Sequence, residues 1–158
     1  MGKVIDRAAL AAELAGHRRQ GRRVVFTNGC FDLLHPGHVD LLERCRTMGD
    51  VLVVAINSDA GVRNLKGPGR PLVPQAERAE LLAALQAVDY VTFFDEPTPR
   101  EIILELRPDT LVKGGDWGLD GTVGREEVVG WGGIVVSAAL LPGYSTSDIV
   151  RKVLQSFP

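Results

Sequence analysis

Apolar runs alternate with helix-like stripes along most of the chain. Five short apolar segments, rich in Val, Ile, Leu and aromatic residues, are typical of strands. These segments cover residues 22–29, 51–57, 89–94, 109–115 and 134–140. Residues 51–57, Val-Leu-Val-Val-Ala-Ile-Asn, are apolar almost throughout, as in a parallel strand that is buried on both faces. We therefore predict a parallel sheet of five strands.

Helical spacing of apolar residues fills the intervals between these strands. The predicted helices cover residues 7–19, 36–49, 75–88, 98–107, 124–133 and 145–157. Asp6 and Thr98 are expected to cap the first and the fourth of them, because their side chains can accept from free backbone N–H groups. The third helix is expected to turn Leu81, Leu82 and Leu85 inward.

The alternation of strands and helices predicts an α/β fold in which helices cover both faces of a parallel sheet. No repeat, low-complexity tract or domain boundary interrupts the pattern, so residues 1–158 are expected to form one domain. Ligands of such sheets bind at the carboxyl ends of the strands. The segments that follow the strands at residues 29, 115 and 140 are therefore expected to lie on one rim.

Residues 58–74 break the periodic pattern. Glycines and prolines gather here with Arg63, Lys66 and Arg70, so we predict a long basic loop. Long loops in compact domains are often functional.

Composition narrows the classes of protein. The 158 residues are 45% apolar and 24% charged, with a net charge of −2, so no basic footprint indicates nucleic-acid binding. Cys30 and Cys45 form neither a CxxC motif nor a disulfide framework, which suits a reducing compartment. The first residues lack a signal peptide's apolar core, and no apolar run approaches the roughly 20 residues of a membrane span. A cytoplasmic protein without a membrane partner is expected.

The first strand leads into an unusual turn. Residues 27–38 read Thr-Asn-Gly-Cys-Phe-Asp-Leu-Leu-His-Pro-Gly-His, which places His35 and His38 where a helix begins. A helix N-terminus attracts anions, and imidazoles there can donate to phosphate oxygens and gain charge as a leaving group forms. Gly29 and Gly37 allow a ligand to come close. The pattern indicates a polyphosphate site. Two satisfied surface histidines, or a metal site completed by Asp32, are the alternatives, and the latter lacks a usual third ligand.

With these residues in view, the chain resembles the HxGH nucleotidyltransferase superfamily, which includes the cytidylyltransferase-like proteins. Three further segments are similar to that superfamily, namely 65–71 (its lysine-bearing loop), 111–117 and 144–149. The resemblance implies a Rossmann-like three-layer sandwich. It also implies transfer of a nucleotidyl group from a nucleoside triphosphate onto a phosphate, with release of pyrophosphate.

Within the superfamily, the chain looks most like the heptose-1-phosphate adenylyltransferases. Glycerol-3-phosphate cytidylyltransferases more often have Tyr-Gly-Thr-Phe-Asp before the histidines and Arg-Thr-Glu-Gly before the serine–threonine turn. This chain has Thr-Asn-Gly-Cys at 27–30 and Leu-Leu-Pro-Gly at 140–143. The missing arginine counts against a cytidylyltransferase, and its phosphate contact would have to come from Arg63, Arg70 or Arg78.

The resemblance also implies roles for individual residues. The expected catalytic residues are His35, His38, Lys66 and Thr146. The expected nucleotide-binding residues are Thr27, Asn28, Gly29, Phe31, Gly37, Lys113, Gly114, Asp116, Ser145 and Ser147. The expected sugar-phosphate contacts are Asp32, Asn57, Arg70 and Arg78. Several have a structural alternative: Lys66 as a solvated lysine, Phe31 as a core residue, Asp32 as a turn residue, Ser145 as a helix cap, and Lys113 as the partner of a carboxylate. Trp117, which follows Asp116, could stack on the ligand or simply pack.

The expected co-substrate is ATP with Mg²⁺, and no acidic cluster specifies a metal held by the protein. A sugar phosphate is the expected acceptor, and relatives of this kind are often homodimers. Two alternatives remain open. One is a cytidylyltransferase for glycerol 3-phosphate or another polyol phosphate, and another is a nucleotide-binding regulatory module without turnover. A dinucleotide-dependent oxidoreductase is disfavoured, because the first strand–helix turn lacks G-x-G-x-x-G.

Overall fold

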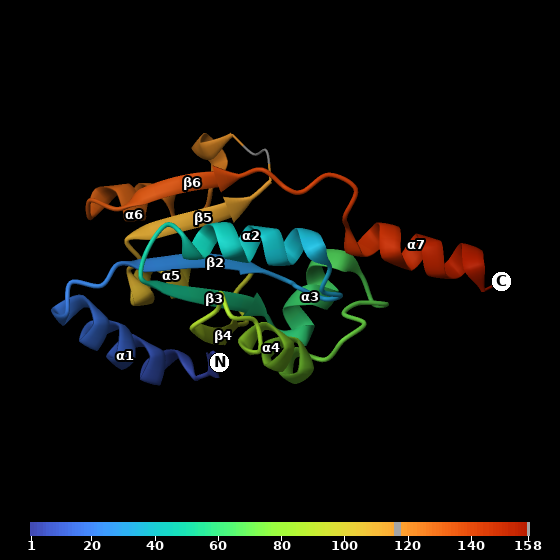
Figure 1. Cartoon of the computed structure of the whole chain (residues 1–158), viewed down its shortest axis with the longest axis horizontal. Coiled ribbons are helices and arrows are strands. Elements are labelled where there is room, and N and C mark those ends of the chain that lie inside the picture. Colours follow the sequence, from blue (N-terminus) through green and yellow to red (C-terminus); the bar gives the residue numbers. More distant parts are fainter. Residues whose placement is uncertain (116–117, 158) are drawn as a thin grey trace.

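A computed structural model, which describes residues 1–115 and 118–157, contains a six-stranded parallel sheet with helices on both faces (Figure 1). The strands are β1 (Lys3–Val4), β2 (Val24–Gly29), β3 (Val51–Asn57), β4 (Tyr90–Phe94), β5 (Thr110–Gly114) and β6 (Ile134–Ala138). The helices are α1 (Arg7–Arg19), α2 (Pro36–Arg46), α3 (Asp59–Lys66), α4 (Gln75–Ala83), α5 (Arg100–Leu106), α6 (Arg125–Gly130) and α7 (Thr146–Ser156), with a 3₁₀ turn at Leu119–Gly121. The predicted α/β sandwich is confirmed.

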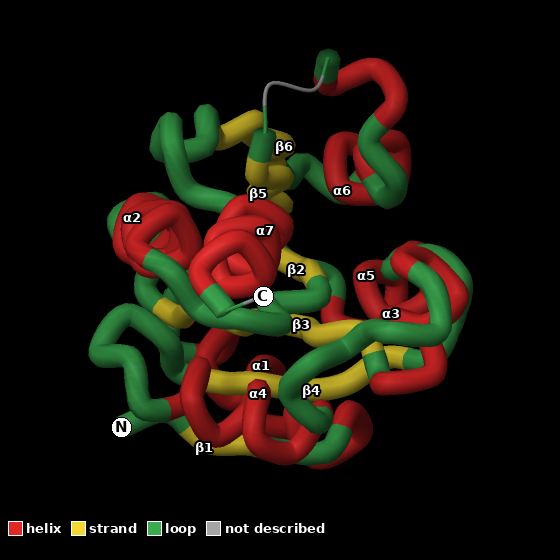
Figure 2. Tube along the Cα trace, turned by 90° about the vertical axis from the view of Figure 1, so that its right-hand side faces the viewer, coloured by secondary structure: helices red, strands yellow, loops and turns green. Residues whose placement is uncertain are grey.

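The strand order explains where a ligand can bind. The order is β1-β4-β3-β2-β5-β6 (Figure 2). Every neighbouring pair is parallel. From β2 the chain builds the sheet first towards β3 and β4, and later in the other direction through β5 and β6. Open α/β sheets bind ligands at the carboxyl ends of the strands where the order reverses in this way. The turn after β2 lies at that point.

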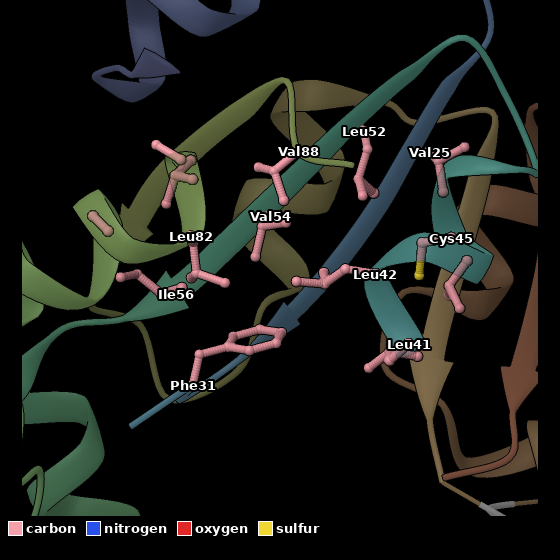
Figure 3. Close-up of a cluster of buried hydrophobic side chains, with 14 of the residues drawn as sticks. Val25, Phe31, Leu41, Leu42, Cys45, Leu52, Val54, Ile56, Leu82 and Val88 are labelled. Atoms are coloured by element: carbon pink, nitrogen blue, oxygen red, sulfur yellow. The ribbon is translucent and has the colours of Figure 1, made fainter. Parts of the chain in front are cut away.

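Each face of the sheet carries its own hydrophobic cluster. On one face, Leu42 and Cys45 of α2 and Leu82 of α4 pack over alternate residues of β2 and β3 (Figure 3). On the other face, side chains of α1, α5 and α6 cover the residues in between. All seven residues of β3 are buried, as its apolar sequence predicts.

The prediction of five strands was wrong by one. The sixth strand, β1, has only two residues, Lys3 and Val4, and both are exposed. It pairs with Tyr90 and Val91 at the edge of the sheet. A two-residue edge strand buries no side chain of its own, so it leaves no apolar run in the sequence.

The prediction of a long loop at 58–74 was also wrong in part, because its first half is helix α3. The Ser58 hydroxyl accepts from the Gly61 N–H and caps this helix, while Val62 is its one buried residue. The prolines and glycines that follow are confined to residues 67–74, which we call the 67–74 loop. Lys66 is therefore the last residue of a helix rather than a loop residue.

Smaller differences concern the helix ends and faces. Helix α5 begins at Arg100 with Pro99 at its N-cap, so Thr98 does not cap it. Leu82 is fully buried as expected, but Leu81 is 49% exposed. Asp6 does cap α1, since its carboxylate accepts from the Ala9 N–H at 2.9 Å.

Helix α7 differs from the others because it extends beyond the body of the molecule (Figure 1). It buries none of its residues, although Val153 and Leu154 are apolar. Among the residues that the structure describes, no helix combines the length and apolar character needed to cross a bilayer.

Candidate active site

The turn after β2 is built around Phe31. This residue has a left-handed backbone, φ 47°, which is uncommon for a residue with a side chain. Its ring is 5% exposed, belongs to the core cluster of Figure 3, and lies 5.1 Å from the ring of His38. A Cβ on Gly29 would come within 3.0 Å of this ring. Packing of Phe31 in the core therefore fixes how the turn approaches α2. Because the Phe31 ring contacts the His38 ring, it also helps to fix the position of His38.

His35 and His38 are stacked on one another. Their ring centroids are 3.8 Å apart, with an angle of 19° between the planes. His35 is the N-cap of α2 and Pro36 is its first residue, while the His38 N–H donates to the His35 carbonyl at 2.9 Å. Proline suits this position, because its fixed φ fits the first helical turn and its missing N–H has no partner to lose there.

Burial keeps the histidine pair uncharged. Burial, and then the neighbouring His35, lower the pKa of His38 to about 4, and burial also lowers the pKa of His35. Nδ1 of both rings is buried without a hydrogen-bond partner among the described residues. In the absence of a ligand both rings are thus neutral at pH 7, and they act as hydrogen-bonding groups rather than as fixed cations.

Gly37 lies between the His35 ring and the segment that precedes α7. A Cβ there would meet His35 Cε1 and Nδ1 at 3.1 Å and Tyr144 Cβ at 3.2 Å. The Tyr144 ring is itself roughly parallel to that of His35, with 6.4 Å between centroids. Glycine at this position lets the two segments approach one another.

The second half of the site is the turn that opens α7. The Ser145 hydroxyl accepts from the Asp148 N–H at 3.0 Å and lies 2.7 Å from the Asp148 carboxylate, so it serves as the helix cap. The Thr146 hydroxyl reaches the Leu33 carbonyl at 3.4 Å, and Ser147 is exposed. The first N–H groups of α7 accordingly lie beside the turn that carries His35.

One cavity of about 270 Å³ joins these two halves. Its wall contains His35, Gly37, His38, Lys66, Leu140, Leu141, Tyr144, Ser145, Thr146 and Ser147. The N-termini of α2 and α7 both reach this wall, and each carries partial positive charge. Pro36 has no N–H and the His38 N–H donates to His35, so the start of α2 offers the N–H of Gly37, whereas the start of α7 offers those of Thr146 and Ser147. Lys66 adds a full positive charge. The arrangement can bind an extended polyanion.

A second cavity of about 160 Å³ adjoins the first, and His38 and Leu140 belong to both. Its other lining residues are Asn28, Gly29, Cys30, Phe31, Leu41, Lys113 and Gly114. A Cβ on Gly114 would come within 2.9 Å of Leu41, so the glycine keeps this cavity open at the end of β5. Asp116 and Trp117, expected here from the sequence, lie outside the described residues.

Five residues predicted for the site have partners within the protein. Thr27 is fully buried and its hydroxyl donates to the Val112 carbonyl at 2.9 Å. Asp32 and Arg70 form an ion pair with each other, 2.5 Å between Oδ2 and Nε. The Asn57 side chain contacts the Cys30 thiol. The guanidinium of Arg78 is fully buried in hydrogen bonds to the protein, so the expectation that it contacts the substrate has no geometric support.

Several lining residues escaped the sequence analysis. Tyr144 could have been noticed, because it directly precedes the serine–threonine turn. Leu41, Leu140 and Leu141 carried no signal of their own, since apolar residues at those positions are equally compatible with a core.

Within residues 1–115 and 118–157, no three His, Cys, Asp or Glu side chains come together as a metal site. The described residues do not fit a metal held by the protein, and we assign Mg²⁺ no protein ligand.

Comparison with known proteins places the chain among relatives. The sequence model of the family described as cytidylyltransferase-like matches residues 26–152. Bifunctional protein HldE of Geobacter sulfurreducens is 54% identical over 155 residues, which is 98% of this chain. Bifunctional protein HldE of Koribacter versatilis is 55% identical over 150 residues, or 95% of this chain. The chain spans about a third of these curated relatives, 32% and 31% of their lengths.

A solved structure is similar as well. It is the crystal structure of the lipopolysaccharide core biosynthesis protein from Thermoplasma volcanium GSS1, with a TM-score of 0.63 and 28% sequence identity. The match covers 77% of this chain and 98% of that chain.

Proposed function

Because the chain belongs to the cytidylyltransferase-like family, we propose that it transfers AMP from ATP onto a sugar 1-phosphate, with release of pyrophosphate. The favoured acceptor is a heptose 1-phosphate, so that the product is an ADP-heptose. The observation that carries the proposal is the cavity in which His35, His38, Lys66 and the N-termini of α2 and α7 converge.

The triphosphate of ATP would lie in this cavity. The N–H of Gly37 in α2 and those of Thr146 and Ser147 in α7 would donate to its oxygens, and Ser147 and Thr146 would add hydroxyls from the α7 turn. Lys66 supplies the balancing positive charge at the cavity wall. Anion binding of this kind needs neither a Walker lysine nor a glycine-rich phosphate loop, because two helix N-termini take their place.

The reaction proposed is a direct in-line displacement. An oxygen of the sugar phosphate forms a bond to the α-phosphorus of ATP, and the bond from that phosphorus to the bridging oxygen of pyrophosphate breaks. The nucleophile is already an anion, so no general base is required. Catalysis rests on positioning and on stabilising charge where it develops.

His38 and His35 act on that developing charge. As neutral rings in the free protein, they donate hydrogen bonds through N–H without carrying a full charge. A phosphate group beside them favours the protonated form and raises their pKa. The pair can therefore gain positive charge only when the triphosphate is bound. The added charge would then stabilise the negative charge that develops on the phosphates.

The adjoining cavity is proposed to hold the nucleoside. Lys113 and Gly114 at the end of β5 lie on one side of it, and Gly29 and Phe31 at the end of β2 on the other. His38 borders both cavities, so an α-phosphate between nucleoside and pyrophosphate would lie next to His38. Mg²⁺ is proposed to arrive with ATP as part of the substrate.

The identity of the acceptor rests on resemblance. Segments 26–42, 57–74 and 111–117 look like those of heptose-1-phosphate adenylyltransferases, and the relatives named HldE match this chain over almost its whole length. The solved relative is a lipopolysaccharide core biosynthesis protein, which is in keeping with a sugar destined for a surface glycan. Arg70 is a proposed contact for the sugar phosphate, because it pairs with Asp32 in the turn after β2.

The test is pyrophosphate release with ATP, CTP, GTP and UTP, each against heptose 1-phosphate, glycerol 3-phosphate and other sugar phosphates. Release with ATP and heptose 1-phosphate, absent in a His38→Ala variant, is the expected result. Release with CTP and glycerol 3-phosphate would instead assign the polyol-phosphate reaction. Tight ATP binding without turnover on any acceptor would point to a regulatory module.

A further inference from the structure

Arg78, in the first turn of α4, is the largest of the described side chains with no solvent exposure. Its guanidinium donates to three carbonyls that belong to three different connections. Nε reaches Val73 at 2.9 Å, one terminal nitrogen reaches Cys30 at 2.6 Å, and the other reaches Asn57 at 3.0 Å. That last nitrogen also pairs with the Asp59 carboxylate at 2.8 Å.

Asp32 makes a matching set of contacts from the opposite side. Its side chain is 1% exposed, and its carboxylate accepts from the Leu72 N–H at 2.8 Å and from the Val73 N–H at 2.9 Å. Arg70 completes the set through its Nε. A buried carboxylate thus holds the 67–74 loop chiefly by its backbone.

Arg78 and Asp32 close a ring of hydrogen bonds that runs through Val73 and Cys30. The N–H of Val73 donates to Asp32, and the carbonyl of Val73 accepts from Arg78. Arg78 in turn holds the carbonyl of Cys30, which is two residues before Asp32 in the chain. The 67–74 loop and the turn after β2 are thereby locked together at Val73.

On one side of the ring stands His38. Phe31 lies between Cys30 and Asp32, so both of its chain neighbours are held by the ring. Its left-handed backbone and the contact of its ring with His38 depend on that turn keeping its shape. Residues in sparsely populated backbone regions persist only where their surroundings over-determine them.

On the other side of the ring stands Lys66. Helix α3 starts at Asp59, whose carboxylate pairs with Arg78 and whose N–H donates to the Gln75 side chain at 2.9 Å. The helix ends at Lys66 and runs directly into the 67–74 loop. Lys66, which is exposed and lines the triphosphate cavity, therefore lies on a helix that is held at both ends by groups that Arg78 and Asp32 bind.

We propose that Arg78 and Asp32 are positioning residues, which hold Lys66 and His38 on the same phosphate chain by locking the 67–74 loop to the turn after β2. The inference rests on the proposed function for the part that concerns catalysis. A buried charged cluster is a poor device for stability alone, because apolar residues of similar volume often serve as well. The Arg78–Asp32 cluster instead contacts the backbones of three connections, so it fixes how these connections lie relative to one another.

The catalytic test is a double-mutant cycle, with kcat and KM for ATP measured in Arg78→Lys, Lys66→Ala and the double variant. Lysine keeps the charge but cannot reach all of the partners of the planar guanidinium. Arg78→Lys is expected to lower kcat about 100-fold, since a misplacement of about 1 Å can cost that much. In the Lys66→Ala background the same change should cost clearly less than about 100-fold, because the part that acts through Lys66 is already lost while the part that acts through His38 remains.

Arg7→Lys is the matched control. Arg7 is a partly buried arginine of α1 that pairs with Glu96 and with Glu105 of α5, and it lines neither cavity. The change likewise replaces an ion-paired arginine by lysine, and it should leave kcat unchanged in either background. Full multiplication of the Arg78→Lys and Lys66→Ala losses would overturn the proposal.

A second test does not depend on turnover. Trypsin cleaves after Lys66, at the start of the 67–74 loop, and release of fragments 1–66 and 67–158 is followed by mass spectrometry. Cleavage should be at least about 10-fold faster in Arg78→Lys than in the wild type or Arg7→Lys. The protease cuts the locally opened state, and loss of the Arg78 contacts makes local opening of the 67–74 loop more favourable. Should Arg78→Lys fail to fold, Asp32→Asn takes its place and should show the same acceleration. Equal cleavage rates would overturn the proposal, whereas a wild type that is inactive on every acceptor would count against the proposed function alone.

Discussion

Two turns that are built in opposite ways face each other across the cavity lined by His35, Lys66 and Thr146. The turn after β2 is set into the core, with Phe31 and Leu42 packed in one cluster and His38 partly covered. The turn before α7 stands on a helix that buries none of its residues. Among the described residues, the Ser145 side chain is held there by its own helix, through Asp148.

The difference indicates which groups of such a site need to be fixed by packing and which do not. Groups that must be placed to a fraction of an ångström, such as His38, are held by packing and by the ring through Arg78. Groups that only offer N–H donors and hydroxyls to a long, variable anion can stand on an exposed helix. We expect the first half to be preformed and the second to order more fully when nucleotide binds.

The largest effect should come from the histidine of the embedded half. His38→Ala is expected to lower kcat/KM by at least about 10³-fold, as the loss of a group that stabilises transition-state charge can. Ser145→Ala should cost only about 10-fold, because its hydroxyl caps α7 and phosphate donors remain beside it. His17→Ala, which removes a histidine bonded to Tyr90 away from the site, is the control. Near-normal turnover of His38→Ala would refute the mechanism.

Stability should separate the two halves as well. Leu42 of α2 is fully buried, so Leu42→Ala should lower the free energy of unfolding by about 2–5 kcal/mol. Leu154 of α7 is 69% exposed, and Leu154→Ala should change it by less than about 0.5 kcal/mol. Urea unfolding of both variants measures the comparison. A large loss in Leu154→Ala would mean that something covers α7 in solution.

A smaller effect should appear when the pH is lowered. Because the pKa of His38 is about 4 in the folded protein and near 6.5 when unfolded, the unfolded chain binds more protons between these values. Stability from the neutral ring is thus complete above about pH 6.5 and is lost as the pH falls towards 4. The free energy of unfolding is measured at about pH 7 and about pH 4.5 for the wild type and for His38→Gln. The loss between the two pH values should be larger in the wild type by on the order of 1 kcal/mol. Identical changes would show that His38 titrates normally.

The sequence predicted the family and most of the fold because those signals are local. Apolar runs marked the main strands, Asp6 and Ser145 marked two helix starts, and the histidine motif marked the site. The resemblance to the cytidylyltransferase-like proteins is confirmed by a match over residues 26–152. Helix α3 was missed because the glycines and prolines after it dominated the local composition, and β1 because an exposed edge strand leaves no pattern.

The role of Arg78 could not be predicted from the sequence. In the sequence it is one more arginine near a basic loop, and a phosphate contact was a reasonable expectation. Only the fold shows that the segments after β2 and β3 and the 67–74 loop meet at its guanidinium, which leaves no exposed surface for a substrate.

Local chemistry was therefore enough to predict which groups gather around one cavity: two imidazoles, a lysine, three hydroxyls and two helix starts. It could not tell how they stand to one another. The stacking of His35 on His38, the loss of their charge by burial, and the choice between a substrate arginine and a positioning arginine all depend on how the elements pack. Such contacts follow from strand order and tertiary packing, which no short stretch of sequence contains.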